Sequence, residues 1–291
     1  MWGSTYLGML LAIRTIPVFL MASLRFLLAG GLLYAWSIRR GDRDIDRPSP
    51  RQWLAAGIAG ALLFVVGNTG VAWAEQRVAT GISSLVIATV PLWMALFDRV
   101  ACGQRLSRAA VLGLGLGFAG VALLAGPSGA GRIDIVGFLV LLLAASCWAA
   151  GSLYTRTAPL PRRPLVGASM QMLVGGALLG LLAAGDGELG RLGHASAESI
   201  LALAYLVVFG SLLAFTAYAW LLRVARTSLV STYAYVNPLV AVFLGWAVEN
   251  EGIGLRTVLA GGLILAAVAL IVSPPRRGPR PAAYAVPARG R

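Results

Sequence analysis

Proline and polar side chains together interrupt two apolar segments of the chain. Thr89-Val90-Pro91 lies inside one apolar run, and Tyr235-Val236-Asn237-Pro238 lies inside another. Proline removes an intrahelical hydrogen bond and clashes with the carbonyl one turn back, so we expect each helix to kink or open here. Freed carbonyls, the Asn237 amide and tyrosine hydroxyls would then face a water-filled cavity. The alternative is a packing kink filled by neighbouring side chains.

Arg25 is a charged residue about seven positions inside an apolar segment. At 1.5 Å per residue it lies roughly 10 Å deep. Its long side chain can reach back to the interface, which is the simpler interpretation. The other is a cation that faces a cavity, where it meets a ligand carboxylate or pairs with Glu75.

A further cluster combines amide, aromatic and carboxylate side chains. It comprises Asn68, Trp73 and Glu75, with Tyr218 in a later segment. An unpaired amide facing lipid is costly, so we expect Asn68 to face the interior of the protein. Trp73 is expected either to contact a ligand or to belong to the aromatic belt at the lipid headgroups.

Groups that make or break bonds are scarce. The chain has one histidine, His194, and two separated cysteines, Cys102 and Cys147. No carboxylate lies in the middle of an apolar segment, so a proton relay gains no support from the sequence. We expect no catalytic residue, no bound metal and no cofactor.

The elements that position these residues are apolar segments of membrane length. Hydrophobic residues make up 58% of the 291 residues and charged ones 12%, and the mean hydropathy is +0.81. Since a span needs about 20 apolar residues, this composition predicts an all-α integral membrane protein. Ten transmembrane segments are expected, roughly at 1–13, 18–38, 53–74, 81–100, 109–126, 135–155, 165–184, 199–222, 228–248 and 255–273.

The C-terminal half repeats the N-terminal half at an offset of 147 residues. Pro91 then falls on Pro238, Thr80 on Thr227, and Gly115 on Gly262. Five segments per copy is an odd number, so the second copy must enter the bilayer from the opposite side. The pattern predicts two inverted five-helix repeats, 1–126 and 135–273. Such repeats are typical of alternating-access transporters.

The arginines indicate the orientation in the membrane. The net charge of +13 comes from arginine alone, and most arginines fall in one set of alternate loops and in the C-terminal tail. The other loops hold only Arg14, Arg77, Arg132, Arg191 and Arg256. The excess of basic residues on the cytoplasmic side predicts that both termini are cytoplasmic. The tail, 274–291, is rich in proline and arginine and is expected to be disordered.

Glycine spacing imitates a nucleotide-binding motif. Gly115 to Gly120 satisfies G-x-G-x-x-G but lies within an apolar run, where only a helix satisfies the backbone. With Gly113, these glycines are expected to let helices approach closely, as are Gly176 and Gly180.

The first segment is shorter than its counterpart. Trp148-Ala149-Ala150-Gly151-Ser152 echoes Trp2-Gly3-Ser4, yet eleven apolar residues precede Trp148 and only Met1 precedes Trp2. The first helix is therefore expected to be N-terminally truncated.

Several motifs together carry a family resemblance. They are Trp2-Gly3-Ser4-Thr5-Tyr6, Arg25-Phe26, Ala74-Glu75, Ala88-Thr89-Val90-Pro91-Leu92 and Ser231-Thr232-Tyr233-Ala234-Tyr235-Val236-Asn237-Pro238. With them the chain resembles the EamA-type exporters of the drug/metabolite transporter superfamily, from Trp2 to about Val272. The resemblance implies ten helices in two inverted repeats, a bacterial inner-membrane location and export of small metabolites. It also implies a central cavity, for which it suggests Ser4, Tyr6, Asn68, Thr89, Trp148, Tyr154, Tyr218, Tyr235 and Asn237.

Three hypotheses compete. The first is a secondary transporter that exports amino acids or related amphipathic metabolites, as a monomer or homodimer in the bilayer. The candidate substrate-binding residues are then the nine that the resemblance suggests for the cavity, together with Arg25, Trp73, Glu75, Pro91 and Pro238. The second is a passive channel or lipid scramblase built on the same repeat. The third is a membrane-embedded enzyme or scaffold. Nucleic acid is not an expected partner.

Overall fold

The fold is helical throughout the part of the chain that the structure describes. A computed structural model describes residues 1–40, 48–102, 108–125, 134–217 and 233–272, and none of these forms a strand. The elements of the N-terminal half are α1 (Trp2–Ile13), α2 (Val18–Arg39), α3 (Pro50–Gly60), η1 (Ala61–Asn68), α4 (Thr69–Ala74), α5 (Thr80–Ile87), α6 (Val90–Cys102) and α7 (Arg108–Ala125). Those of the C-terminal half are α8 (Ile135–Thr157), α9 (Pro164–Gly185), η2 (Glu188–His194), α10 (Ala197–Tyr205), η3 (Leu206–Leu213), α13 (Tyr233–Glu249) and α14 (Leu255–Val272).

Many of these helices are long and apolar enough to cross a bilayer. Six qualify by length and composition: Val18–Arg39, Pro50–Ala74, Thr80–Val100, Ile135–Thr157, Pro164–Gly185 and Ala197–Ala217. Shorter apolar helices are Trp2–Ile13, Arg108–Leu124, Val236–Glu249 and Leu255–Ile271. Large apolar side chains such as Leu32, Leu181 and Phe243 are exposed on them, as lipid contact requires. The protein is therefore an all-α membrane protein, while the count of ten spans and the inverted repeat stay predictions.

Side-chain caps fix where several helices begin. Ser49 and Gln52 form a reciprocal capping box at the start of α3. Asp134 and Ser196 accept backbone N–H groups at the starts of α8 and α10. Each cap satisfies donors that the first turn leaves without an intrahelical partner.

The predicted proline kinks differ between the two halves. The span 80–100 breaks between α5 and α6, and Pro91 occupies the first turn of α6, where proline is tolerated. By contrast, α13 continues as one helix through Pro238. The expected opening is therefore seen at Pro91, whereas the helix at Pro238 stays continuous.

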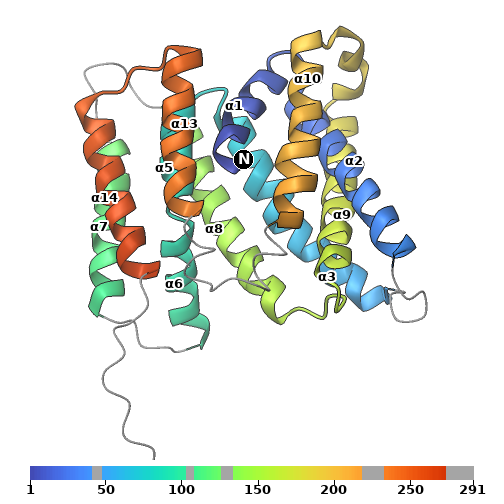
Figure 1. Cartoon of the computed structure of the whole chain (residues 1–291), viewed down its shortest axis with the longest axis horizontal. Coiled ribbons are helices and arrows are strands. Elements are labelled where there is room, and N and C mark those ends of the chain that lie inside the picture. The colour runs from blue at the N-terminus through green and yellow to red at the C-terminus, as the bar shows by residue number, and fades with distance from the viewer. Residues whose placement is uncertain (41–47, 103–107, 126–133, 218–232, 273–291) are drawn as a thin grey trace, which may run out of the picture.

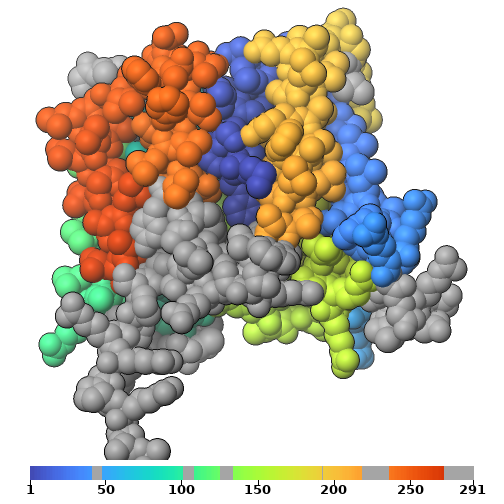
Figure 2. Space-filling view, in the orientation of Figure 1, coloured from blue at the N-terminus to red at the C-terminus, as the bar shows by residue number. Residues whose placement is uncertain are grey.

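Helices from the two halves are intermixed. α2 packs along α9, α7 along α14, and α1 lies between α10 and α13. Figure 1 shows α7 and α14 at one edge of the molecule and α2, α3 and α9 at the other. In the space-filling view, α1 (blue) is seen between α13 (orange) and α10 (gold) (Figure 2).

Glycines allow these pairs to come close. A Cβ at Gly120 would lie 3.0 Å from the Ala260 carbonyl of α14, and one at Gly113 would lie 2.9 Å from the Ala267 carbonyl. A Cβ at Gly176 would lie 3.0 Å from the Leu27 amide nitrogen of α2. The predicted packing role of these glycines is confirmed. It does not extend to Gly115, which has nothing within 4 Å of a built Cβ.

Candidate functional site

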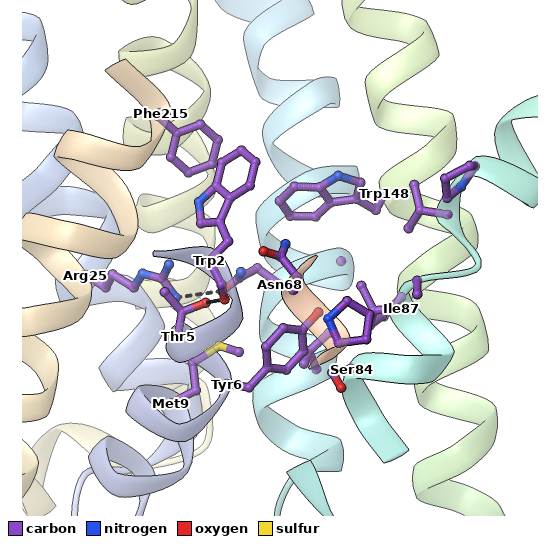
Figure 3. Close-up of a pocket in the computed structure, with 18 residues that line it drawn as sticks. Trp2, Thr5, Tyr6, Met9, Arg25, Asn68, Ser84, Ile87, Trp148 and Phe215 are labelled. Carbon is purple, nitrogen blue, oxygen red and sulfur yellow. Dashed lines mark hydrogen bonds between the residues drawn. The ribbon is translucent and has the colours of Figure 1, made fainter. Parts of the chain in front are cut away.

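A cavity lies where α1, α2, η1, α8 and the break between α5 and α6 meet. Its volume is about 90 Å³, room for several water molecules. Both halves of the chain line it, and Pro91 and Pro238 are both part of its wall. Figure 3 shows Arg25 on one side of this cavity and Trp148 on the other.

Arg25 is buried and reaches the cavity from α2. Only 2% of its surface is exposed, so it does not extend back to the interface. Its Nε donates to Ser211 Oγ at 3.0 Å, and its Nη1 donates to Asn68 Oδ1 at 3.1 Å. Neutral oxygens thus hold the guanidinium in place without cancelling its charge.

Two π-helical segments supply those oxygens. Asn68 is the last residue of η1 and Ser211 lies within η3. A π-helical turn shifts the side chains that follow it around the helix axis, and such turns are frequent at functional sites. Thr69 Oγ1 donates to the Phe64 carbonyl at 2.8 Å, and the same carbonyl accepts from the Thr69 backbone N–H at the end of η1.

The charge balance of the cavity is positive. Among the described residues that line it, Arg25 is the only charged one and none is a carboxylate. An isolated buried cation is costly unless an anion accompanies it. The cavity is therefore suited to a ligand that brings a negative group.

Aromatic rings cover another part of the wall. Trp2 and Phe215 meet edge to face with their ring centroids 5.5 Å apart, and Phe64 makes edge-to-face contacts with Phe215 and Trp148. Trp2 Nε1 donates to the Gly210 carbonyl at 3.2 Å, which fixes the indole against η3. These rings offer an apolar surface beside the cation.

Comparison with known proteins decides the family. The profile of the EamA-like transporter family matches residues 1–126 and 135–273. The chain belongs to the EamA-like transporter family.

Relatives of this EamA-like transporter occur in distant organisms. It is 38% identical over 273 residues to the uncharacterized inner membrane transporter YedA of Escherichia coli K12, covering 93% of this chain and 86% of YedA. It is 26% identical over 285 residues to the chloroplastic WAT1-related protein At3g02690 of Arabidopsis thaliana, covering 94% and 67% of the two chains. It is 24% identical over 277 residues to an uncharacterized transporter of Archaeoglobus fulgidus, covering 93% and 94%. The chain is thus a membrane transporter and not an enzyme, and a small molecule is its substrate.

A solved crystal structure shares the fold. The match has a TM-score of 0.65 at 23% sequence identity and covers 93% of this chain and 92% of the other. At this identity the likeness concerns the fold alone.

The cavity brings together half of the residues proposed from the sequence. The ones that line it are Tyr6, Arg25, Asn68, Pro91, Trp148, Asn237 and Pro238. Their contact with substrate stays a prediction. Close packing supports the position of Asn237, because a Cβ on Gly3 of α1 would lie 2.8 Å from the Asn237 carbonyl.

Two small polar candidates point elsewhere. Ser4 Oγ and Tyr205 Oη share a hydrogen bond of 2.6 Å, so Ser4 faces α10. Thr89 is fully buried, and its Oγ1 donates to the Val86 carbonyl at 2.6 Å, which caps the end of α5. Both hydroxyls are engaged within the protein.

Three larger candidates also lie outside the cavity lining. The Arg77 guanidinium lies over the ring of Trp73, with Arg77 Cζ 4.4 Å from the ring centroid. Tyr154 packs against the hydrophobic core. Glu75 is buried, and the described residues include no ion pair between it and Arg25. The suggested pairing is therefore absent, because Arg25 is instead held at mid-helix by Asn68 and Ser211.

Two further candidates cannot be placed. Tyr218 lies outside the described residues, and Tyr235 lies in α13 with a side chain that the structure does not describe.

Sequence reasoning missed several residues of the wall. Trp2, Thr5 and Met9 line the cavity with Tyr6. They follow one another at spacings of three or four residues, which place them on a single face of α1. That periodicity was a usable signal, whereas nothing local to Phe215 indicated that it faces Trp2.

Proposed function

We propose that this transporter exports small metabolites that carry a carboxylate, amino acids or related amphipathic compounds, by alternating access. The observation that carries the proposal is the buried Arg25 guanidinium, which no described carboxylate accompanies, in a cavity lined by both halves of the chain. A substrate carboxylate supplies the missing negative charge through a charge-assisted hydrogen bond. The aromatic rings of Trp2, Trp148 and Phe215 pack on its apolar part.

The break between α5 and α6 supports binding of an amino group. Ala88 and Val90 line the cavity at this break. Carbonyls at the end of a helix lack intrahelical donors and carry partial negative charge, so they can accept from an ammonium group. With no carboxylate among the wall residues that the structure describes, we expect zwitterions and anions to bind and organic cations to be rejected.

The pairing of corresponding helices supports an inverted repeat. The sequence offset places α2 on α9 and α7 on α14, and these are the helices that pack along each other. A pseudo-two-fold axis between the halves produces that arrangement. The π-helical segments η1 and η3 also fall at nearly matching positions of the halves. Rocking of one half against the other around the Arg25 site is the alternating-access motion that such repeats permit.

The arginines support a cytoplasmic location of both termini. Arg39, Arg51, Arg99, Arg108 and Arg156 lie at helix ends that Figure 1 shows at one end of the bundle. Arginine excess marks the cytoplasmic side. With the location in YedA's name, this favours the inner membrane of a bacterium.

Counterflow in proteoliposomes tests the proposal. A panel of amino acids and analogues is first screened by thermal shift, since a ligand at 100 times its Kd stabilises by about 2.7 kcal/mol. The stabilising compound is then supplied labelled outside and unlabelled inside. Saturable uptake with trans-stimulation is the expected result. Non-saturable flux without trans-stimulation would indicate a channel, and lipid flip-flop would indicate a scramblase.

Asn68→Asp is expected to abolish binding of that compound while the protein stays folded. In the wild type, Asn68 Oδ1 accepts a hydrogen bond from Arg25. The new carboxylate takes the place of this amide, so it neutralises the guanidinium within the cavity. Asn68→Ala removes one hydrogen bond without neutralising the charge, and we expect it to weaken binding by only about tenfold. Thermal-shift titration measures both. Equal losses in the two variants would contradict a role for cavity charge.

A further inference from the structure

A buried carboxyl group lies at the end of the bundle opposite the arginine-rich one. Glu75 follows the span Pro50–Ala74, in the connection to α5, and is 5% exposed. Neither of its carboxyl oxygens has a hydrogen-bond partner in the part of the chain that the structure describes. An ionised carboxylate in such a place loses its hydration and gains nothing in return.

Glu251 brings a second carboxylate to the same place from the C-terminal half. It lies in the connection between α13 and α14 and accepts from two amides of the first turn of α5. Thr80 N donates to Oε1 at 2.6 Å and Gly81 N donates to Oε2 at 3.0 Å. Glu251 thus ties the two halves of the chain together at a helix N-terminus, where a negative charge is favourable.

The local backbone explains how Glu251 reaches α5. Asn250 ends α13 with a φ of 53°, in the left-handed region that asparagine tolerates. The turn folds the chain back so that Glu251 N donates to the Gly245 carbonyl at 3.0 Å. Gly245 leaves the room that the carboxylate occupies, because a Cβ there would clash with Glu251 Oε2.

Three arginines described at this end bind other groups. Arg256 donates from Nε and Nη2 to the Leu123 and Leu124 carbonyls, while its buried Nη1 has no partner among the described residues. Arg77 lies 3.9 Å from Asp134, and Arg14 binds the carboxylates of Glu198 and Glu249. None of these forms an ion pair with Glu75 among the described residues. Thr80 Oγ1 is buried as well, and no described residue forms a hydrogen bond with it.

The surroundings of Glu75 favour the protonated form of its carboxyl group. Burial, and then the negative charge of Glu251, raise the pKa of Glu75 well above its usual value. A proton removes both penalties at once.

We propose that Glu75 is a proton-binding site, and that Glu75 and Glu251 form a proton-operated latch between the two halves of the transporter. With Glu75 protonated, Glu251 stays on the α5 amides and this end is closed. When Glu75 loses its proton, two carboxylates face each other, and Glu251 leaves α5. The latch would act as a gate in the alternating-access cycle, so this proposal rests on the proposed transport function. Its tests need no substrate.

The sign of the pH dependence follows from linkage. The closed state holds the Glu75 proton more tightly than the open or unfolded state does. Its extra stability is therefore fully present at acid pH and is lost as the pH rises through the raised pKa of Glu75. Acid closes the latch and alkali opens it.

Thermal unfolding of the purified full chain between about pH 5 and pH 9 is the first test. We expect the melting temperature of the wild type to fall with pH by roughly 3–6 °C more than that of Glu75→Gln, whose amide cannot ionise. Glu198→Gln removes an exposed carboxylate at the same end and should keep the wild-type profile. A pH dependence unchanged by Glu75→Gln would overturn the proposal. Stabilisation of the wild type but not of Glu75→Gln by sodium at constant pH would also overturn it, by assigning the site to a metal cation.

The second test reads the opening itself. Gln76→Cys and Gly252→Cys place spin labels on the two connections, at exposed positions, in a chain whose native cysteines are replaced by serine. We expect the distance between the labels to increase with pH, and Glu75→Gln to remove this change. Gly245→Ala keeps both carboxylates but displaces Glu251 from its position, so it should open the latch even at acid pH. A distance independent of pH in the wild type, or a latch unaffected by Gly245→Ala, would overturn the proposal and leave the export function standing.

Discussion

Arg25→Gln is expected to lower the affinity for carboxylate-bearing substrates by about 100-fold, the equivalent of roughly 2.7 kcal/mol. Glutamine can still reach the cavity but brings no charge, so the substrate carboxylate would be buried opposite a neutral amide. Loss of one partner in a buried charged pair costs about 2–5 kcal/mol. The thermal stabilisation given by the best compound of the panel measures the effect.

Two arginine variants control this experiment. Arg99→Gln removes an exposed arginine at the end of α6 and should leave binding unchanged. Arg25→Lys keeps the charge, but a lysine ammonium cannot reproduce the two hydrogen bonds that the planar guanidinium donates to Ser211 and Asn68. An intermediate affinity is therefore expected. If Arg25→Gln bound the compound as well as the wild type does, the carboxylate hypothesis would fail.

Gly30→Ala is expected to lower the melting temperature by roughly 5 °C, because it separates α2 from α9. The added Cβ would lie 2.9 Å from the Met172 Cβ and 3.1 Å from both the Leu173 amide nitrogen and the Ser169 carbonyl oxygen. Backbone atoms cannot rotate away, so the helices themselves must move. Overpacking of this kind costs about 1–3 kcal/mol.

The neighbouring residue supplies the matched control. Gly31 lies in the same helix and has nothing within 4 Å of a built Cβ. Gly31→Ala should therefore be neutral or slightly stabilising, since alanine favours a helix over glycine. Unfolding of the two purified variants in one detergent gives the comparison. Similar melting temperatures would show that α2 and α9 do not pack as closely as described.

Apolar length and proline predicted much of the secondary structure. The segments expected at 18–38 and 165–184 correspond to α2 (Val18–Arg39) and α9 (Pro164–Gly185). The break before Pro91 followed from the missing amide of proline, which is a local property. At Pro238 the helix does not open, because α13 continues through it, and a kink there stays a prediction. The packing of α13 against α1 and α5, which no local pattern reports, accompanies that continuity.

The candidate site was predicted less completely. A polar residue in an apolar run is visible in the sequence, and Arg25, Asn68 and Asn237 were found in this way. The direction of a side chain is not visible, so Ser4 and Thr89 were included although their hydroxyls bond to Tyr205 and Val86. A pair of Glu75 with Arg25 was one of the alternatives, whereas the charge that acts on Glu75 is that of Glu251.

The sequence by itself determined that this chain crosses a membrane, which residues break its apolar runs, and which family it resembles. All three depend on composition and short-range order, and the bilayer imposes helices on any such segment. Only the tertiary structure decided what surrounds each charge. Arg25 is held by Ser211, 186 residues away, and Glu251 reaches α5 across 171 residues. Contacts at that separation come from the packing of helices against one another, which follows from the shapes of two surfaces and not from either segment alone.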